Sequence, residues 1–322
     1  MNILATAESP ASPLKVTVAT LAFRRPDGLR TLLEALRYQQ QTDARLYELT
    51  VLIVDNDAAG TGRAIAEEFA DDEAYRLIYM IEPRQGIPMG RNRALDETPA
   101  DTDFFVFIDD DEWPVPGWLD SMLATRETTD ADVIHGPVEP VFAREGNTYF
   151  IKARAFADRH HVDGERIYYA ASNNVMMDFQ RVRAAGLRFD ERMRFTGGED
   201  FLFFNQAVRR GFTVAWSHSA MVFDDIPASR MTWKWVLRRQ FRIGNTFAIA
   251  ARIQDSGWRQ LRLLCVGLMR MGLGSALLPM LLFSPRYGFR GLSHLIRGAG
   301  IVIGTFGLAY EEYSPSKLAK SQ

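Results

Sequence analysis

The sequence predicts an α/β protein in which a mostly parallel sheet is flanked by helices and followed by an apolar helical appendage. Apolar runs of strand length alternate with amphipathic stretches of helical length between residues 15 and 112, and this alternation is typical of βαβ units. The apolar runs also lack a strict in-and-out pattern, as expected for strands that are covered on both faces.

The expected elements follow one another at short intervals. Strands are expected at 15–23, 49–57, 76–82 and 104–112, and helices at 26–40, 61–69, 90–97 and 199–211. Residues 133–180 are expected to form short strands and loops, and 229–256 one or two helices rich in arginine and aromatic residues. Ligands of such sheets bind beyond the carboxyl ends of the strands, so the acids that end the second and fourth strands are site candidates.

Composition narrows the possible functions. The chain has 322 residues, of which 47% are hydrophobic and 24% charged, and its net charge is −2. This near-neutral balance gives no support to nucleic-acid binding. The single cysteine, Cys265, excludes a disulfide framework and a thiolate zinc site. The first residues lack the pattern of a signal peptide, so the catalytic part is expected in the cytoplasm.

The sequence divides into an expected leader (1–14), an α/β domain (15–257) and a membrane-associating helical region (258–322). The last region is apolar and rich in glycine, but arginines interrupt it. This pattern is typical of helices that lie at a membrane surface while their arginines reach the headgroups. Short spans and a re-entrant pair stay open, and a buried core or dimer contact is the alternative.

The strongest chemical signal is the acidic run Asp109, Asp110, Asp111 and Glu112, which directly follows the apolar segment FFVFI. Packed carboxylates repel one another unless a cation neutralises them. Oxygen ligands of this kind suit Mg²⁺ or Mn²⁺. The run therefore predicts a divalent-metal site, with a solvated acidic turn as the alternative.

Two further motifs are candidates for donor binding. The segment VLIVDND (51–57) ends in Asp55 and Asp57, whose carboxylates could accept hydrogen bonds from a nucleobase or ribose; a plain Asx turn would also explain them. The segment PRQGIPMGRNRAL (83–95) contains Arg91, which could meet phosphates or a base. A basic first helical turn is the alternative for this segment.

The segment FTGGEDFLFFNQAVRRGF (195–212) predicts a two-glycine turn that presents Glu199 and Asp200 at the start of a helix. A positioned general base needs such a setting, although the two acids could instead cap the helix. In 233–246, Arg238, Arg239 and Arg242 form a basic stretch that could clamp a diphosphate or contact anionic lipid headgroups. An ordinary solvated basic face explains this stretch equally well.

Taken in order, the motifs TLAFRRPDGL, VDND, GRNRAL, FIDDDE, NNVMM and GGEDFLFF resemble those of glycosyltransferase family 2. The resemblance covers about residues 15–250 and points to bacterial exopolysaccharide-type enzymes of the GT-A fold. It implies a nucleotide diphosphate sugar as donor, usually a UDP-sugar, and Mn²⁺ or Mg²⁺ as cofactor. It also implies inversion of the anomeric carbon by a single displacement.

The resemblance assigns roles to individual residues. Asp55 matches the acid that contacts the nucleoside, with Asp57 as its neighbour, and Arg91 matches a basic position near the base or phosphates. Asp109 and Asp111 match the metal motif, with Asp111 as the expected direct ligand, and Asp110 between them is expected among the donor-binding residues. Asp200 matches the general base, and Glu199 matches the residue that orients the acceptor. Arg239 and Arg242 match the residues that contact the diphosphate.

The acceptor is expected to be a hydroxyl of a glycan or a lipid-linked glycan in cell-surface polysaccharide synthesis. The enzyme is then expected at the cytoplasmic face of the inner membrane, bound peripherally or inserted shallowly. Two alternatives remain. A sugar-1-phosphate nucleotidyltransferase should carry a glycine-rich loop after the first strand, where this chain has AFRRPDGL. A non-catalytic carbohydrate-binding scaffold would need neither the metal acids (Asp109 and Asp111) nor the Glu-Asp pair (Glu199 and Asp200).

Overall fold

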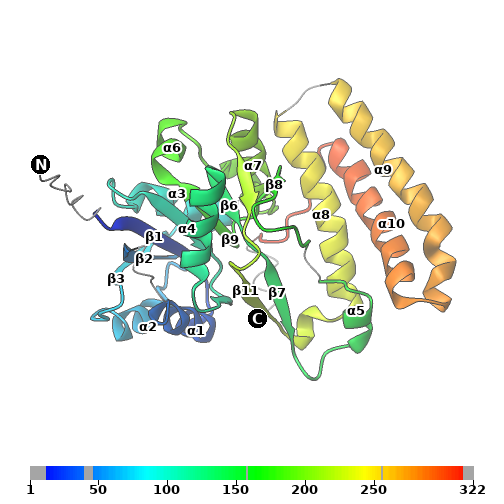
Figure 1. Cartoon of the computed structure of the whole chain (residues 1–322). Helices are drawn as coiled ribbons and strands as arrows, with labels where there is room; N and C mark the ends of the chain where they lie inside the picture. The colour runs from blue at the N-terminus through cyan, green and yellow to red at the C-terminus, as the bar shows by residue number, and fades with distance from the viewer. Residues whose placement is uncertain (1–11, 40–45, 157–158, 255–256, 315–322) are drawn as a thin grey trace, which may run out of the picture.

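The computed structural model in Figure 1 describes residues 12–39, 46–156, 159–254 and 257–314. Most of the predicted leader, 1–14, lies outside the described residues, and the first strand begins at Leu14. An α/β part occupies one side of the molecule, and a layer of long helices stands on the other side (Figure 1).

Within the described residues, eight strands form the main sheet in the order β3-β2-β1-β4-β9-β6-β10-β8. Their bounds are Leu14–Ala22 (β1), Tyr47–Asp55 (β2), Arg76–Ile81 (β3), Phe104–Ile108 (β4), Val133–His135 (β6), Arg166–Ile167 (β8), Asn174–Asp178 (β9) and Val214–Trp216 (β10). Strands β3, β2, β1 and β4 are parallel, whereas β9 is antiparallel to both β4 and β6. The predicted, mostly parallel sheet is confirmed.

Helices cover both faces of this sheet. Their bounds are Pro26–Arg37 (α1), Arg63–Glu68 (α2), Ile87–Glu97 (α3), Trp118–Thr129 (α4), Phe179–Ala184 (α6) and Glu199–Arg209 (α7). Apolar side chains of α1, α2 and α4 pack on one face, and those of α3, α6 and α7 pack on the other. Because neither face meets water, the central strands can be apolar throughout.

The predicted strand 104–112 is two strands in the structure. Strand β4 ends at Ile108, and β5 (Glu112–Pro114) joins a second sheet with β7 (Val138–Phe142) and β11 (Val222–Ile226). The chain turns between them, where the backbone N–H of Glu112 donates to the carbonyl of Asp109 at 3.2 Å and the carboxylate of Asp110 accepts a hydrogen bond from the backbone N–H of Phe23 at 3.0 Å. The acidic run therefore occupies the junction of the two sheets.

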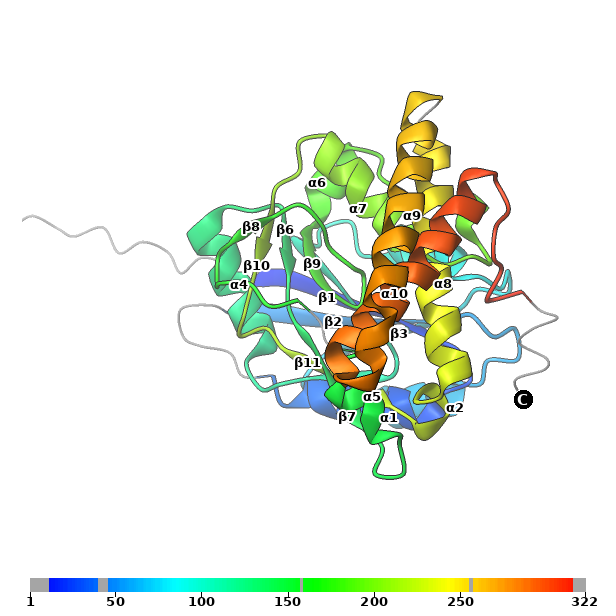
Figure 2. The ribbon, with the colours of Figure 1, turned by 90° about the vertical axis from the view of Figure 1, so that its right-hand side faces the viewer.

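The C-terminal part forms a layer of three long helices (Figures 1 and 2). They are α8 (Trp233–Gln254), α9 (Trp258–Leu277) and α10 (Pro285–Thr305). The remaining helical segments among the described residues are α5 (Thr148–Lys152), η1 (Glu191–Met193), η2 (Ala228–Arg230) and η3 (Leu278–Leu282). Helix α10 packs against both α8 and α9. Among the described residues, one helical stretch is long and apolar enough to cross a membrane: Trp258–Leu282, with 25 residues and only 11% of its most apolar window buried.

Glycines let α9 and α10 approach each other closely. A Cβ atom on Gly274 would lie 2.4 Å from the backbone nitrogen of Leu295, whereas a Cβ atom on Gly272 would meet nothing within 4 Å. We expect Gly274→Ala to destabilise the protein by about 1–3 kcal/mol, because the two backbones must move apart. Gly272→Ala should stabilise it by up to about 1 kcal/mol, because alanine favours the helix. Thermal unfolding compares the two variants, and equal stability would contradict the close packing.

Candidate functional site

The carboxyl ends of β1, β2 and β4 meet at one edge of the sheet, and the predicted acids lie there. Asp55 ends β2 and is fully buried. Its carboxylate accepts hydrogen bonds from three internal donors: the N–H of Asp57 at 3.0 Å, the N–H of Gly62 at 2.7 Å and the hydroxyl of Tyr79 at 2.8 Å. Asp55 therefore fixes the turn that presents Asp57.

Asp57 lies beside Arg24, two residues after the end of β2. Its Oδ2 accepts a hydrogen bond from Nε of Arg24 at 3.0 Å, and its Oδ1 accepts one from the N–H of Ala59 at 3.3 Å. Burial raises the pKa of Asp57, but these hydrogen bonds outweigh burial and hold the pKa below its ordinary value. The pair thus offers an ionised acceptor and a half-exposed guanidinium donor.

Arg91 joins motifs that are far apart in the sequence. It lies on α3, and its side chain is 8% exposed. One nitrogen of its guanidinium donates to Oε1 of Glu199, and the other lies 3.5 Å from Oδ1 of Asp109. The arginine predicted to meet a base or phosphates is therefore the bridge between the acidic run and the Glu-Asp pair.

The predicted two-glycine turn is confirmed. Gly197 and Gly198 have φ values of +73° and +80°, a conformation that other residues rarely adopt. Gly198 is the N-cap of α7, so the cap position that the sequence offered to the two acids is held by a glycine. Asp200 accepts a hydrogen bond from the N–H of Phe201 at 2.6 Å and stands inside the first turn.

Glu199 is buried next to Arg91. Its Oε2 has no hydrogen-bond partner among the described residues. Burial raises the pKa of Glu199 to about 7, the charge of Arg91 opposes this rise and the charge of Asp200 adds to it. A buried acceptor without a donor is costly, and a substrate hydroxyl could supply that donor.

Two members of the acidic run are buried. Asp110, predicted among the donor-binding residues, accepts a hydrogen bond from Arg25 at 2.9 Å as well as from Phe23, and burial raises its pKa to about 7. Glu112 accepts hydrogen bonds from the N–H of Asp109 at 3.2 Å and the amide of Asn173 at 3.1 Å. Both residues tie the junction of the two sheets together from inside.

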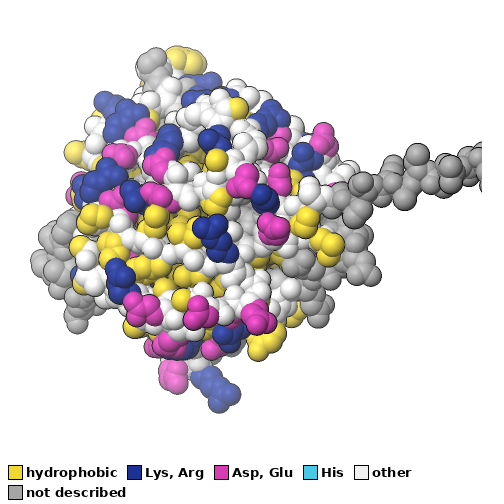
Figure 3. Space-filling view, turned by 90° about the vertical axis from the view of Figure 1, so that its left-hand side faces the viewer, with side chains coloured by type: hydrophobic (Ala, Val, Ile, Leu, Met, Phe, Trp, Pro, Cys, Tyr) yellow, Lys and Arg dark blue, Asp and Glu magenta, His cyan; other side chains and the backbone are white. Residues whose placement is uncertain are grey.

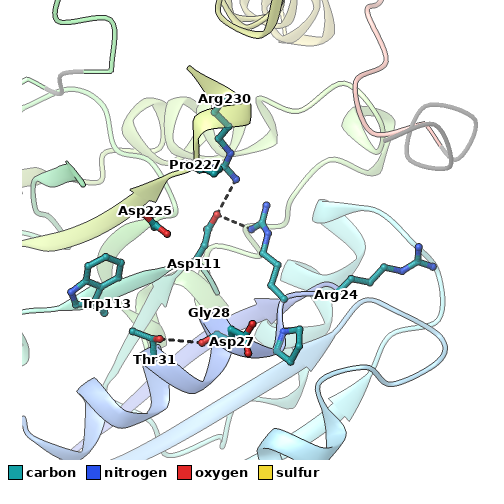
Figure 4. Close-up of a pocket in the computed structure, with 11 residues that line it drawn as sticks. Arg24, Asp27, Gly28, Thr31, Asp111, Trp113, Asp225, Pro227 and Arg230 are labelled. Carbon is teal, nitrogen blue, oxygen red and sulfur yellow. Dashed lines mark hydrogen bonds and ion pairs between the residues drawn. The ribbon is translucent and has the colours of Figure 1, made fainter. Parts of the chain in front are cut away.

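Two arginines contact the carboxylate of Asp111 (Figure 4). Its Oδ2 lies 2.9 Å from a guanidinium nitrogen of Arg25 and 3.0 Å from one of Arg230. Arg230, on η2, also lies 3.7 Å from Asp224 on β11. The sequence analysis did not predict a role for Arg25, Arg230 or Asp224. Arg25 left a signal, because it follows the first strand, but nothing local places residues 224 and 230 beside Asp111.

A cavity of about 390 Å³ opens beside Asp111, between the start of α1, β5 and the segment from β11 to η2 (Figure 4). Its lining combines charges of both signs with one indole: Arg24, Arg25, Pro26, Asp27, Gly28, Thr31, Asp111, Trp113, Asp225, Pro227 and Arg230. A small number of placed charges and an aromatic face suit a polar ligand with both a charged and an apolar part.

The residues of the acidic run have the donor chemistry for a divalent ion. Within the described ranges, no three His, Cys, Asp or Glu side chains are grouped so as to hold a metal. Asp224 of β11 is a further carboxylate near the acidic run, since burial and the charges of Asp111 and Asp109 raise its pKa to about 7. Oδ1 of Asp224 is buried and has no hydrogen-bond partner among the described residues. Arg25 and Arg230 neutralise Asp111 here, so a metal ion would have to displace them.

The two arginines predicted to meet the diphosphate turn toward the site. Arg242 donates to the hydroxyl of Tyr313 at 2.6 Å and lies near Glu199. The guanidinium of Arg239 lies over the rings of Phe156 and Trp235, 5.5 Å from each centroid. Burial and the charge of Arg242 lower the pKa of Arg239, and the charge of Asp224 acts against them.

The sequence profile described as glycosyl transferase family 2 matches residues 17–189, which is more than half of the chain. The chain belongs to glycosyl transferase family 2. The matched region of this family member runs from β1 through the acidic run to Phe189, just before η1. The Glu-Asp pair and the helical layer lie beyond it.

Comparison with individual proteins supports the same assignment. This family 2 glycosyltransferase is 26% identical to the succinoglycan biosynthesis protein ExoM of Rhizobium meliloti, over 97% of this chain and 100% of that protein. Residues 1–349 of Staphylococcus aureus TarS, in complex with UDP-GlcNAc, match with a TM-score of 0.53 and 15% identity, over 92% of this chain and 93% of that chain. GalNAc-T7 with UDP, GalNAc and Mn²⁺ matches with a TM-score of 0.55 and 10% identity, over 75% and 48%. The two structures show the GT-A-like fold.

The Arg91 bridge of this glycosyltransferase predicts a large stability effect. We expect Arg91→Met to cost about 3–5 kcal/mol of unfolding free energy, because it leaves the buried Glu199 without its cation. Arg93→Met is the control on the same helix. Arg93 pairs with Glu97 at a partly exposed position, so its loss should cost at most about 1 kcal/mol. Urea unfolding measures both values, and similar losses would contradict the role of the bridge.

Proposed function

We propose that this chain is an inverting, metal-dependent glycosyltransferase that moves a sugar from a UDP-sugar to a hydroxyl of a glycan or lipid-linked glycan in exopolysaccharide synthesis. The observation that carries the proposal is the Arg91 bridge, in which one guanidinium contacts both Asp109 of the acidic run and Glu199 of the Glu-Asp pair. The name of ExoM, a succinoglycan biosynthesis protein, supports the pathway class. The UDP-GlcNAc held by TarS supports the donor class.

The nucleoside would bind beyond the carboxyl ends of β1 and β2. Arg24 and Asp57 offer a donor and an ionised acceptor there, and these can pair with the polar edge of a base or a ribose. Asp55 holds their loop in place through its three internal hydrogen bonds. A nucleoside diphosphate would then extend from this edge toward the acidic run.

The diphosphate would lie between the acidic run and the arginines of α8. Asp109 and Asp111 would hold Mn²⁺ or Mg²⁺, which offsets the negative charge on a leaving nucleotide diphosphate when it is bound. Asp110 supports this turn from the interior. Arg239 and Arg242 of α8 would contribute positive charge, since Arg239 feels the charge of Asp224 and Arg242 that of Glu199.

Asp200 is the proposed general base. The acceptor oxygen attacks the anomeric carbon, its proton passes to the carboxylate of Asp200, and the bond between the anomeric carbon and the diphosphate oxygen breaks. This single displacement inverts the anomeric centre and needs no covalent nucleophile. Glu199 would orient the acceptor, because its unpartnered Oε2 can accept a hydrogen bond from a hydroxyl.

We place the enzyme at the cytoplasmic face of the inner membrane, with 258–322 as the membrane-associating region. The exposed apolar stretch Trp258–Leu282 supports this location, since an apolar helix of a soluble core would be mostly buried. Family membership favours glycosyl transfer over the nucleotidyltransferase alternative. The presence of both the metal acids and the Glu-Asp pair argues against a non-catalytic scaffold.

A donor screen tests the proposal without knowledge of the acceptor. The protein is incubated with a panel of UDP-, GDP- and dTDP-sugars, with Mn²⁺ or with chelator, and the release of nucleoside diphosphate is measured. We expect slow hydrolysis of a UDP-sugar that needs Mn²⁺. Formation of UDP-sugar and diphosphate from UTP and a sugar 1-phosphate would instead support the nucleotidyltransferase. No release from any donor would contradict the proposal.

A further inference from the structure

Arg270 on α9, and His294 and Arg297 on α10, form a cluster of two guanidinium groups and one imidazole, apart from the acidic run and the Glu-Asp pair. The charges of Arg270 and Arg297 both act on His294. Arg297 in turn feels the charges of Arg270 and of Arg239 on α8. Like charges that face one another destabilise a fold unless an anion lies between them. The three side chains, called here the α9–α10 cluster, therefore have the character of an anion site.

The α9–α10 cluster contains buried nitrogen atoms that lack a hydrogen-bond partner. Nε of Arg270, a donor, and Nδ1 of His294, which donates or accepts according to the tautomer, are buried and have no hydrogen-bond partner among the described residues. Arg297 donates through Nε to Oε1 of Gln240, a neutral acceptor that leaves the positive charge uncompensated. Buried groups of this kind are costly when left unpaired. A bound phosphate would satisfy several of them at once, because its oxygens accept from many donors.

The surrounding sequence supplies no carboxylate to neutralise the cluster. Residues 258–310 contain six arginines and one histidine but no aspartate or glutamate. The far side of the molecule differs, since Lys and Arg side chains intermix there with Asp and Glu (Figure 3). The positive charge of α9 and α10 is therefore a local property of this layer.

The same layer exposes an apolar surface. Helix α9 lies on the outside of the layer (Figure 2), and large apolar side chains of α9, η3 and the segments beside them are exposed. They are Trp258, Leu261, Leu268, Met269, Leu273, Leu281, Leu282 and Phe283. A ligand that matches both features must carry hydrocarbon as well as phosphate, and a phosphorylated lipid does.

We propose that the α9–α10 cluster binds the phosphate groups of a phosphorylated lipid whose hydrocarbon lies along the apolar face of α9. Resting on the proposed function, this lipid is the carrier of the acceptor glycan. Arg297 lies near Arg239, and Arg239 lies near Asp224 at the transfer site. A lipid phosphate in the α9–α10 cluster would therefore hold the attached glycan near Asp224 and the acidic run.

Vesicle binding tests the lipid site separately from catalysis. The full chain is titrated with phosphatidylcholine vesicles that contain either a polyprenyl diphosphate or phosphatidylserine at equal surface charge. We expect about tenfold tighter binding to the diphosphate vesicles, because charge-assisted hydrogen bonds from the cluster add to the general attraction. Inorganic diphosphate, which lacks hydrocarbon, should bind at least about tenfold more weakly than the lipid. Equal binding to the two kinds of vesicle, or equal affinity for inorganic diphosphate, would overturn the proposal.

A matched pair of variants locates the site. Arg270→Gln should abolish the preference for diphosphate lipid, whereas Arg262→Gln, an exposed position on the same helix, removes the same charge and should keep the preference. Retention of the preference in Arg270→Gln would overturn the proposal. UDP titration of the wild-type protein measures the transferase site separately. Wild-type protein that binds UDP but shows no preference between the vesicles refutes the lipid site and leaves the proposed function standing.

Discussion

Asp200→Asn is expected to lower sugar transfer by about 10²–10⁴-fold, because that is the usual contribution of positioned proton transfer. Asparagine keeps the size of the side chain but cannot take up the acceptor proton. The N-cap of α7 is Gly198, so the substitution removes no cap. The affinity for UDP and the midpoint of thermal unfolding should therefore stay close to those of the wild type.

Steady-state kinetics with a fixed UDP-sugar, together with UDP titration and thermal unfolding, checks the role of Asp200. A variant that melts normally and still transfers sugar at a near wild-type rate would show that Asp200 is not the base. Glu199 would then be the next candidate, because its Oε2 is buried without a partner among the described residues. Asp190→Asn serves as a control for the loss of a carboxylate at a helix start, since Asp190 caps η1 and pairs with Arg192.

Asp111→Asn is expected to weaken UDP binding in the presence of Mn²⁺ and almost to abolish transfer. The diphosphate and the acidic run would repel each other without a cation between them, and we expect a divalent ion to take this place by displacing Arg25 and Arg230 from Asp111. The wild-type protein should therefore bind UDP much more tightly with Mn²⁺ than with chelator. In the variant, the two conditions should give similar, weak affinities, because the expected metal ligand is gone.

Calorimetric titration of UDP with Mn²⁺ and with chelator measures this difference. Asp225→Asn removes a carboxylate from the lining of the same cavity but not from the acidic run, so it should keep the dependence on Mn²⁺. Wild-type affinity that is equal in chelator would refute the metal assignment. In that case Arg25 and Arg230, which already neutralise Asp111, would remain as the cations of the site.

The sequence by itself determined the class of fold and the positions of the main motifs. Apolar runs and leucine spacing are local patterns, and Leu29, Leu32, Leu33 and Leu36 of α1 are all buried as the spacing predicts. The two-glycine turn was equally readable, because positive φ angles select for glycine. The acidic run was correctly placed beyond the end of an apolar strand, although the strand ends at Ile108 rather than continuing through the acids.

Only the tertiary structure decided which charges meet. Arg91 and Glu199 are 108 positions apart, and Arg230 and Asp111 are 119 apart. Such pairs depend on strand order and on how helices pack, and neither periodicity nor turn chemistry within one segment contains that information. The same holds for Asp224 and for the α9–α10 cluster, whose members come together because glycines let two helices touch. Local chemistry therefore determined the elements, and long-range packing decided the electrostatics of the site.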